Sequence, residues 1–178
     1  MSVVIISAES YCQREEIAGK TAQTLGYPCI SREVLADASE RYRIPEAKLE
    51  EALNNTSSFL NKLSNTRTRN LAYFEASLSA ALNKDNVVYH GFAGHLLPRD
   101  ITHVLRVCLV ANRDHRVALA VEREGMTKRA AHRMMKRDDD NRGRWTEFLF
   151  NSGPWDKRLY DIKIPMHATS VEDAAGMI

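Results

Sequence analysis

The sequence has few cysteines and no long apolar run. Cys12, Cys29 and Cys108 are widely spaced, and none belongs to a CxxC pair. Cys29 and Cys108 lie in apolar strand-like runs, so we expect both to be small core residues. No apolar run approaches the roughly 18 residues of a membrane span, and no basic leader precedes the first apolar segment. These absences predict a protein of the reducing cytoplasm with no membrane-bound part.

The chain also lacks a strong excess of charge of either sign. Its 25 basic and 23 acidic residues give a net charge of +2, too balanced to indicate nucleic acid or a membrane surface as a partner. Basic residues do cluster in residues 128–144, where Asp138, Asp139 and Asp140 interrupt them. At 178 residues the length predicts a single domain over 1–178, with room for a small lid.

Short apolar segments alternate with amphipathic ones along the whole chain. Residues 2–7, 86–91, 104–110 and 160–164 have strand character. Helices are expected over 13–25, from 31, from 45, over 71–83, over 113–124, from 127 and over 171–178. Gly26 and Gly125 mark helix ends, whereas Ser31, Thr127 and Ser170 are candidate N-caps. The polar segment 54–70 is left open between a mobile loop and a frayed helix. Short, uniformly apolar strands between helices predict an α/β fold with a parallel sheet covered on both faces.

Glycine is missing where the N-terminal pattern requires it. A strand, a turn and a helix at the N-terminus are typical of P-loop phosphate-binding folds. The turn is normally rich in glycine, so that backbone N–H groups can surround a phosphate. Here residues 9–16 read ESYCQREE and contain no glycine. Gly19-Lys20-Thr21 matches the end of a P-loop motif, but it lies inside the helix and is interpreted as a coincidence.

Several stretches in their order resemble the cytidylate-kinase-like family of P-loop nucleoside-monophosphate kinases. The resemblance covers nearly the whole chain. The residues that carry it are Glu16-Ile17-Ala18, Leu25-Gly26-Tyr27-Pro28, Arg32-Glu33-Val34-Leu35, Gly91-Phe92-Ala93-Gly94, Arg113-Asp114-His115-Arg116-Val117, Glu122-Arg123-Glu124-Gly125, Asp139 with Arg142, Trp155, and Tyr160-Asp161.

The resemblance implies a three-layer fold with a five-stranded parallel sheet flanked by helices and a helical lid. It also implies a helical monophosphate-binding region over 31–85 and a lid-type region over 126–158. The implied activity is transfer of a phosphoryl group from ATP to a monophosphate such as CMP, with Mg²⁺. In that chemistry the protein mainly positions groups and neutralises charge.

This chain departs from the family pattern at the loop. The family's glycine positions correspond to Tyr11, Gln13 and Arg14, and its basic position corresponds to Glu15. Two unit charges about 4 Å apart repel by about 4 kcal/mol at an effective dielectric constant of 20. Phe92 stands where the family usually has an arginine. We therefore expect a degenerate phosphate-binding loop, with these residues at the nucleotide position: Cys12, Gln13, Arg14, Glu15 and Glu16.

The resemblance also assigns residues outside the loop. Substrate contacts are expected from Arg32, Gly91, Arg116 and Arg133, and catalytic contacts from Arg137 and Arg142 of the lid. Guanidinium groups suit phosphates because they bind them in a bidentate manner. The plainer interpretation is that these arginines are solvated charges on amphipathic helices. No metal ligand is assigned, although Asp138–Asp140 could hold Mg²⁺ through water.

Three functions remain open on the sequence. The first is an active CMP-type kinase that uses ATP and Mg²⁺. The second, which the loop chemistry favours, is a non-catalytic or strongly impaired relative with no such cofactors. It would bind a nucleotide, a phosphorylated small molecule or a protein partner. The third is a nucleic-acid-binding or structural dimer module, which only the basic segment supports. The apolar stripe of Leu71, Phe74, Leu78 and Leu82 fits the core better than a homodimer contact.

Overall fold

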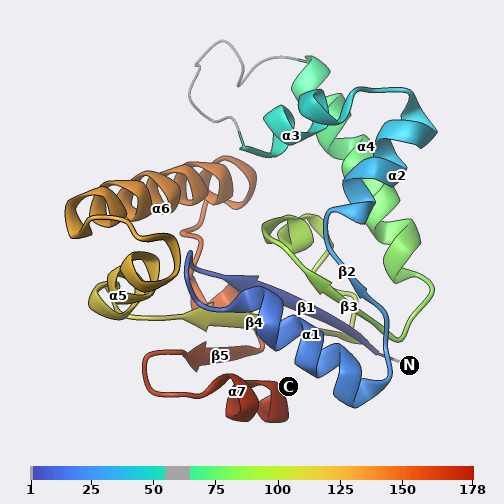
Figure 1. The fold of residues 1–178 in the computed structure, drawn as a ribbon. Helices are drawn as coiled ribbons and strands as arrows, with labels where there is room; N and C mark the ends of the chain where they lie inside the picture. The colour runs from blue at the N-terminus through green and yellow to red at the C-terminus, as the bar shows by residue number, and fades with distance from the viewer. Residues whose placement is uncertain (1, 55–64) are drawn as a thin grey trace.

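The protein is described here by a computed structural model that covers residues 2–54 and 65–178. Its centre is a five-stranded sheet in the order β2-β3-β1-β4-β5, with every neighbouring pair parallel (Figure 1). The strands are β1 (Val3–Ala8), β2 (Cys29–Ile30), β3 (Val87–His90), β4 (Val104–Val110) and β5 (Ile162–Pro165). The expected parallel α/β fold is confirmed.

Helices connect the strands and surround the sheet. The α-helices are α1 (Arg14–Leu25), α2 (Glu33–Tyr42), α3 (Glu46–Asn54), α4 (Asn65–Leu82), α5 (Arg113–Glu124), α6 (Lys128–Phe150) and α7 (Val171–Met177). Two 3₁₀ turns, η2 (Phe92–Leu96) and η3 (Lys157–Leu159), complete the described elements. Helices α5 and α6 pack together beside the sheet, and α2, α3 and α4 form a separate group above it (Figure 1).

The two faces of the sheet bury two different cores. Because side chains alternate along a strand, Val3 and Ile5 of β1 face a core that includes Phe74 and Leu78 of α4. Val4, Ile6 and Ala8 face the opposite core, which includes α1 and α7. β1 is the central strand and is buried throughout. The residue after β1 is therefore held at the middle of the sheet edge, where β1, β3 and β4 end.

Local sequence signals set several helix ends. Gly26 and Gly125 take left-handed backbone angles directly after α1 and α5, as expected for helix-ending glycines. The Thr127 side chain accepts a hydrogen bond from the Ala130 N–H, and that of Ser170 accepts one from the Asp173 N–H. All four expected boundaries are confirmed.

Other expectations need correction. Cys29 is exposed because β2 is a two-residue strand at the edge of the sheet, whereas Cys108 is buried as expected. Ser31 does not cap α2. Its hydroxyl donates to the His90 carbonyl oxygen at 2.8 Å, and Arg32 occupies the N-cap position. Helix α4 begins six residues before the expected start, at Asn65. The rest of the polar segment, 55–64, lies outside the described residues.

The apolar stripe of α4 is part of the core. Leu71, Phe74, Leu78 and Leu82 are all at most 6% exposed, so the stripe is occupied within the chain itself. Among residues 2–54 and 65–178, no helix combines the length and apolarity that crossing a membrane requires.

One pair of glycines allows the packing at the end of β3 to be tested. A Cβ added at Gly94 would lie 2.4 Å from Cγ2 of the buried Ile5, whereas one added at Gly19, in the exposed middle of α1, meets nothing within 4 Å. We expect Gly94→Ala to lower the free energy of unfolding by about 1–3 kcal/mol. Gly19→Ala should raise it by about 0.5–1 kcal/mol. Urea denaturation measures both, and equal effects of the two substitutions would contradict this packing.

Candidate functional site

The turn between β1 and α1 has left-handed backbone angles at two residues, although it contains no glycine. Tyr11 and Gln13 have positive φ angles of 62° and 52°, at two of the three positions where the resemblance places glycine. A left-handed conformation costs a residue with a side chain about 1–2 kcal/mol. Arg14 is the first residue of α1 and has no need of a positive φ. Such conformations persist only where the surroundings enforce them.

Contacts on both flanks hold the turn in place. The Glu9 carboxylate accepts a hydrogen bond from the Ala111 N–H at 2.8 Å, just after β4. The Tyr11 hydroxyl donates to the carboxylate of Glu124 at the end of α5, and it lies 3.8 Å from Sδ of Met134 on α6. Burial and the bond to Glu124 raise the pKa of Tyr11 to about 12, so the phenol keeps its proton and remains a donor.

A buried guanidinium joins the turn to α6. Arg116 of α5 is 3% exposed. Its Nη1 and Nη2 donate to the two carboxylate oxygens of Asp139 at 3.1 and 2.8 Å. Its Nε donates to the Ser10 carbonyl oxygen at 2.9 Å, and Glu9 lies 3.5 Å from Nη1. The Ser10 hydroxyl also donates to Asp138 at 3.2 Å. Two of the three neighbouring aspartates of α6, Asp138 and Asp139, therefore bind the chain's own turn and its arginine.

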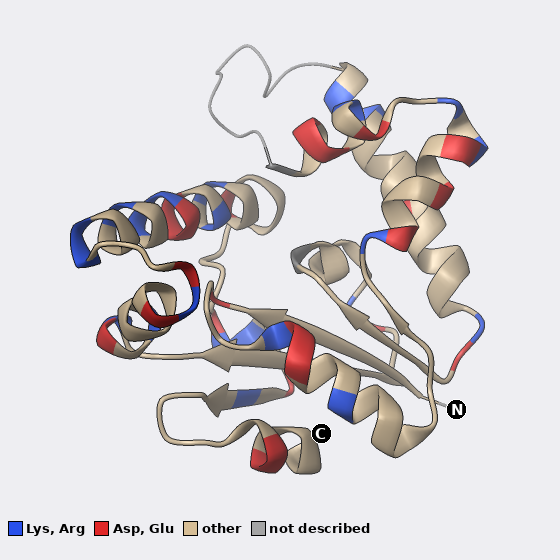
Figure 2. Ribbon diagram, in the orientation of Figure 1, with Lys and Arg blue, Asp and Glu red and all other residues tan. Residues whose placement is uncertain are grey.

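The turn borders a cavity of about 320 Å³. Four glutamates and three arginines line it together with Ser10, Tyr11, Cys12 and Gln13; the charged residues are Glu9, Glu15, Glu16, Glu124, Arg14, Arg123 and Arg142. The lining therefore carries one net negative charge. In Figure 2, acidic and basic residues alternate in colour along the ribbon of α6 as well. The described residues that line this cavity therefore carry no excess of positive charge.

The three arginines of this cavity have contacts within the chain. Arg123 pairs with Glu16 at 2.6 Å, Arg14 lies 3.8 Å from Glu15, and Arg142 donates to the Ala8 carbonyl oxygen. Arg142 also lies over the Trp155 ring, 5.7 Å from its centroid. Burial, and after it the charge of Arg14, lower the pKa of Arg142. Arg14 and Arg142 are thus near neighbours of like charge.

Cys12 lies beneath the turn and does not face the cavity as a reactive thiol. It is 1% exposed and belongs to the core formed with α1. Burial, followed by the negative charge of Glu9, raises its pKa to about 12. Because only the thiolate is strongly nucleophilic, this side chain serves packing at neutral pH.

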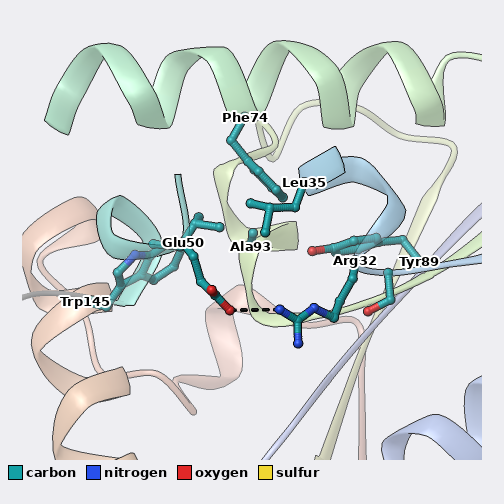
Figure 3. A pocket seen from close by; sticks show the side chains of 9 residues that line it. Arg32, Leu35, Glu50, Phe74, Tyr89, Ala93 and Trp145 are labelled. Carbon is teal, nitrogen blue, oxygen red and sulfur yellow. Dashed lines mark hydrogen bonds and ion pairs between the residues drawn. The ribbon is translucent and has the colours of Figure 1, made fainter. Parts of the chain in front are cut away.

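A second cavity, which we call the acceptor pocket, lies between the end of β3 and helices α2, α3, α4 and α6 (Figure 3). Its volume is about 170 Å³, and it is lined by Ser31, Arg32, Leu35, Glu50, Leu53, Phe74, Tyr89, Ala93 and Trp145. An apolar pocket with a few convergent polar groups is typical of small-molecule sites.

Arg32 and Glu50 face one another across the acceptor pocket. The two side chains form an ion pair at 3.1 Å, as the dashed line in Figure 3 shows. Arg32 was expected to contact a substrate, and it does line this pocket. Its side chain is 79% exposed and that of Glu50 is 46% exposed, so the pair is solvated and can open at little cost.

Buried polar contacts support the far wall of the acceptor pocket. His95 of η2 lies 2.9 Å from the Tyr160 hydroxyl, which donates to the Pro154 carbonyl oxygen at 2.6 Å. The Tyr160 oxygen is therefore available to accept the Nε2–H of His95. Burial, with smaller contributions from Arg106 and Arg99, lowers the pKa of His95 to about 4. The ring is neutral at pH 7 and keeps this donor role.

The remaining expected site residues are dispersed. Gly91 lies between β3 and η2, and a Cβ there would meet the Tyr89 hydroxyl oxygen at 2.4 Å. Phe92 begins η2. Arg133 and Arg137 are exposed on α6, and Arg137 lies 3.6 Å from Asp138. Lys20, of the coincidental motif, pairs with Glu172 of α7, away from the turn.

Of the nine residues that line the acceptor pocket, only Arg32 was predicted as a site residue. Glu50 and Trp145 are two of those that sequence reasoning missed. Trp145 lies three residues after Arg142 on α6, a spacing that puts both on one side of the helix. Glu50 shows no comparable signal, because it is 18 residues from Arg32 and belongs to a different helix.

The family model of the cytidylate kinase-like family matches residues 3–168. The chain belongs to the cytidylate kinase-like family. This match confirms the family that the sequence predicted. A comparison with curated protein sequences finds no match.

Solved structures show the same fold. An uncharacterized protein from Eubacterium ventriosum superposes with a TM-score of 0.74 at 20% identity, over 99% of this chain and 95% of that one. A shikimate kinase from Bacteroides thetaiotaomicron gives 0.56 at 11% identity, over 99% and 95%. A gluconokinase from Sinorhizobium meliloti gives 0.53 at 12% identity, over 98% and 87%. At these identities the likeness is one of fold.

The Arg116 contacts predict a large and specific loss of stability. Arg116→Met leaves two carboxylates, Glu9 and Asp139, without their cation. We expect the free energy of unfolding to fall by about 3–5 kcal/mol. Arg113→Met, at an exposed position of the same helix, should change it by less than about 0.5 kcal/mol. Urea denaturation of both variants measures the difference, and a small effect of Arg116→Met would contradict the role of this guanidinium.

His95 predicts a pH dependence of stability. Its pKa is about 4 in the folded chain and about 6.5 when unfolded. As the pH falls from 6.5 to 4, the unfolded state gains a proton that the folded state does not. The free energy of unfolding should therefore fall by up to about 3 kcal/mol. His95→Gln should flatten this slope, whereas His167→Gln, at an exposed position, should leave it unchanged. Parallel curves for the wild type and His95→Gln would contradict the assignment.

Proposed function

We propose that this member of the cytidylate kinase-like family is a binding protein with a degenerate phosphate-binding loop. It takes a nucleotide or another small anionic molecule and is non-catalytic, or strongly impaired, in phosphoryl transfer from ATP. The observation that carries the proposal is the charge of the loop cavity, where four glutamates outnumber three arginines. Phosphoryl transfer needs donors and cations around the phosphates, and this lining offers the opposite balance.

The side chains of the turn support the same proposal. In a P-loop, glycines let the backbone N–H groups approach the phosphates closely. Here Tyr11 and Gln13 hold the glycine-type angles, but both bring side chains into the cavity lining. Gln13 also donates to Glu16 at 3.3 Å, which keeps a carboxylate at the start of α1.

The acceptor pocket supports retained binding. It has an apolar floor, a rim with the Arg32–Glu50 pair, and a volume of about 170 Å³. A monophosphate or a similar small acid therefore suits a pocket of this size better than a triphosphate. This reasoning supports a nucleotide or phosphorylated small molecule as the partner.

The alternative is an active CMP-type kinase with ATP and Mg²⁺. The left-handed backbone at Tyr11 and Gln13 favours it, since these are two of the positions where the family resemblance places glycine. Arg142 of α6 also reaches the turn, where it donates to Ala8. In this case Arg14 would replace the missing basic residue.

Restoring the loop tests the proposal. We expect the wild type to show no shift in thermal unfolding with millimolar ATP and Mg²⁺. The combined variant Tyr11→Gly, Gln13→Gly, Arg14→Gly and Glu15→Lys should bind ATP at least about tenfold more tightly, because it regains N–H access and exchanges an anion for a cation. A ligand at 100 times its Kd adds about 2.7 kcal/mol to stability, which is readily measured.

Two further variants serve as controls. Glu15→Lys alone changes only charge and guards against misfolding of the combined variant. Glu46→Lys makes the same exchange in the exposed first turn of α3 and should have no effect on ATP binding. If the wild type binds ATP and converts CMP to a diphosphate with release of ADP, the proposal is wrong and the active-kinase alternative holds.

A further inference from the structure

Arg67, in the first turn of α4, is buried where three helices meet. The residue as a whole is only 7% exposed. Its Nε donates to the Ala52 carbonyl oxygen near the end of α3, at 3.1 Å. The guanidinium carbon lies 4.7 Å from the centroid of the Phe148 ring on α6. Helices α3, α4 and α6 therefore all contact one cation.

The charge of Arg67 has no counter-ion among residues 2–54 and 65–178. Within these residues, Nη1 and Nη2 are buried and lack a hydrogen-bond partner. Burial alone lowers the pKa of Arg67, with no acidic group acting against it. The sequence of residues 55–64, NTSSFLNKLS, holds no Asp or Glu. A buried, unpaired charge is costly, and folded proteins normally retain one only with a compensating partner.

A structural role explains only part of this arrangement. The bond to Ala52 uses Nε, and the contact with Phe148 uses the face of the guanidinium. The Nη1–Nη2 edge, which is the edge that binds carboxylates and phosphates in a bidentate manner, contributes to neither. An uncharged side chain could pack on Phe148 without the cost of a buried charge. The unused edge therefore points to an anion from outside the chain.

The position of Arg67 relates this edge to the acceptor pocket. The same three helices line that pocket through Leu53, Phe74 and Trp145. Leu53 follows Ala52 directly, Trp145 lies three residues before Phe148, and Phe74 lies seven residues after Arg67. Residues seven apart share a helix face, so Arg67 and Phe74 lie on one face of α4, with Arg67 about two turns from Phe74 and outside the residues that line the pocket.

We propose that Arg67 binds the carboxylate or phosphate of a small ring-containing molecule whose ring occupies the acceptor pocket. This inference rests on the proposed use of that pocket for binding. An apolar cavity of about 150 Å³ holds benzene, and the acceptor pocket of about 170 Å³ matches a body of one ring. The acidic group is then recognised at the helix junction, and the Arg32–Glu50 pair lies at the rim.

Simple aromatic probes test the inference without ATP. Benzoate and phenyl phosphate carry the anion on one ring, benzamide is their neutral counterpart, and inorganic phosphate is the anion alone. We expect calorimetry to show benzoate or phenyl phosphate binding the wild type at least about tenfold more tightly than benzamide. Arg67→Met should remove that preference, and Arg67→Lys should restore part of it.

The matched control is Arg69→Met, an exposed position on the same helix, which should bind all probes as the wild type does. Arg67-dependent binding of inorganic phosphate alone would support the anion site, with free phosphate as its source. If benzamide binds as tightly as benzoate, or if Arg67→Met keeps the preference for the anion, the inference is overturned while the pocket still binds. If no probe binds any variant, the inference is overturned as well, and the ATP experiment still judges the proposed function independently.

Discussion

The buried guanidinium of Arg116 is the contact on which the turn depends. It reaches a carbonyl oxygen of the turn, a carboxylate at the end of β1 and a carboxylate of α6. Each of these segments comes from a different part of the chain. A single charge of opposite sign thereby fixes the end of the central strand, the turn and the lid-side helix together. Because the guanidinium itself is almost fully removed from water, removing its carboxylate partners is costly.

In this arrangement Asp138 and Asp139 of α6 act as counter-ions and hydrogen-bond acceptors for groups of the chain itself. In a phosphate-binding site, the cations near the turn would have no counter-ion from the protein and would bind the anionic ligand. Here Asp139 fills the fork of Arg116, and Asp138 accepts from Ser10. The protein supplies its own anions at the turn, whereas Nη1 and Nη2 of Arg67, at the junction of α3, α4 and α6, lack a hydrogen-bond partner among the described residues. This arrangement agrees with the proposal that the protein binds small acids rather than triphosphates.

The sequence predicted what local chemistry determines. Alternating strand and helix patterns predicted the parallel sheet, and Gly26, Gly125, Thr127 and Ser170 marked helix ends because each acts on its own neighbours. Tyr11 and Gln13, at two of the positions assigned to glycine, have left-handed backbone angles, and the assignment itself stays a prediction. The expected roles of the individual arginines in a site stay predictions.

Pairings across long separations could not be predicted in the same way. Nothing near Arg116 in the sequence indicates Asp139 as its partner, and nothing near Arg67 indicates that its charge is buried under Phe148. Cys29 was predicted to be a core residue because its neighbours in the sequence are apolar. It is exposed because β2 is a short strand at the edge of the sheet. Such features follow from the assembled fold, where a side chain's environment is set by distant segments.

The left-handed angles at Tyr11 and Gln13 have one more consequence. Because these residues gain nothing from such angles themselves, the shape of the turn must be imposed by the strand, the helix and the contacts around it. The backbone conformation of the turn is thus set by the elements around it, and its chemistry is set by its own side chains. The shape of the turn therefore depends mainly on its surroundings, whereas the side chains at Gln13 and Glu15 determine the charge and hydrogen-bonding groups of the cavity.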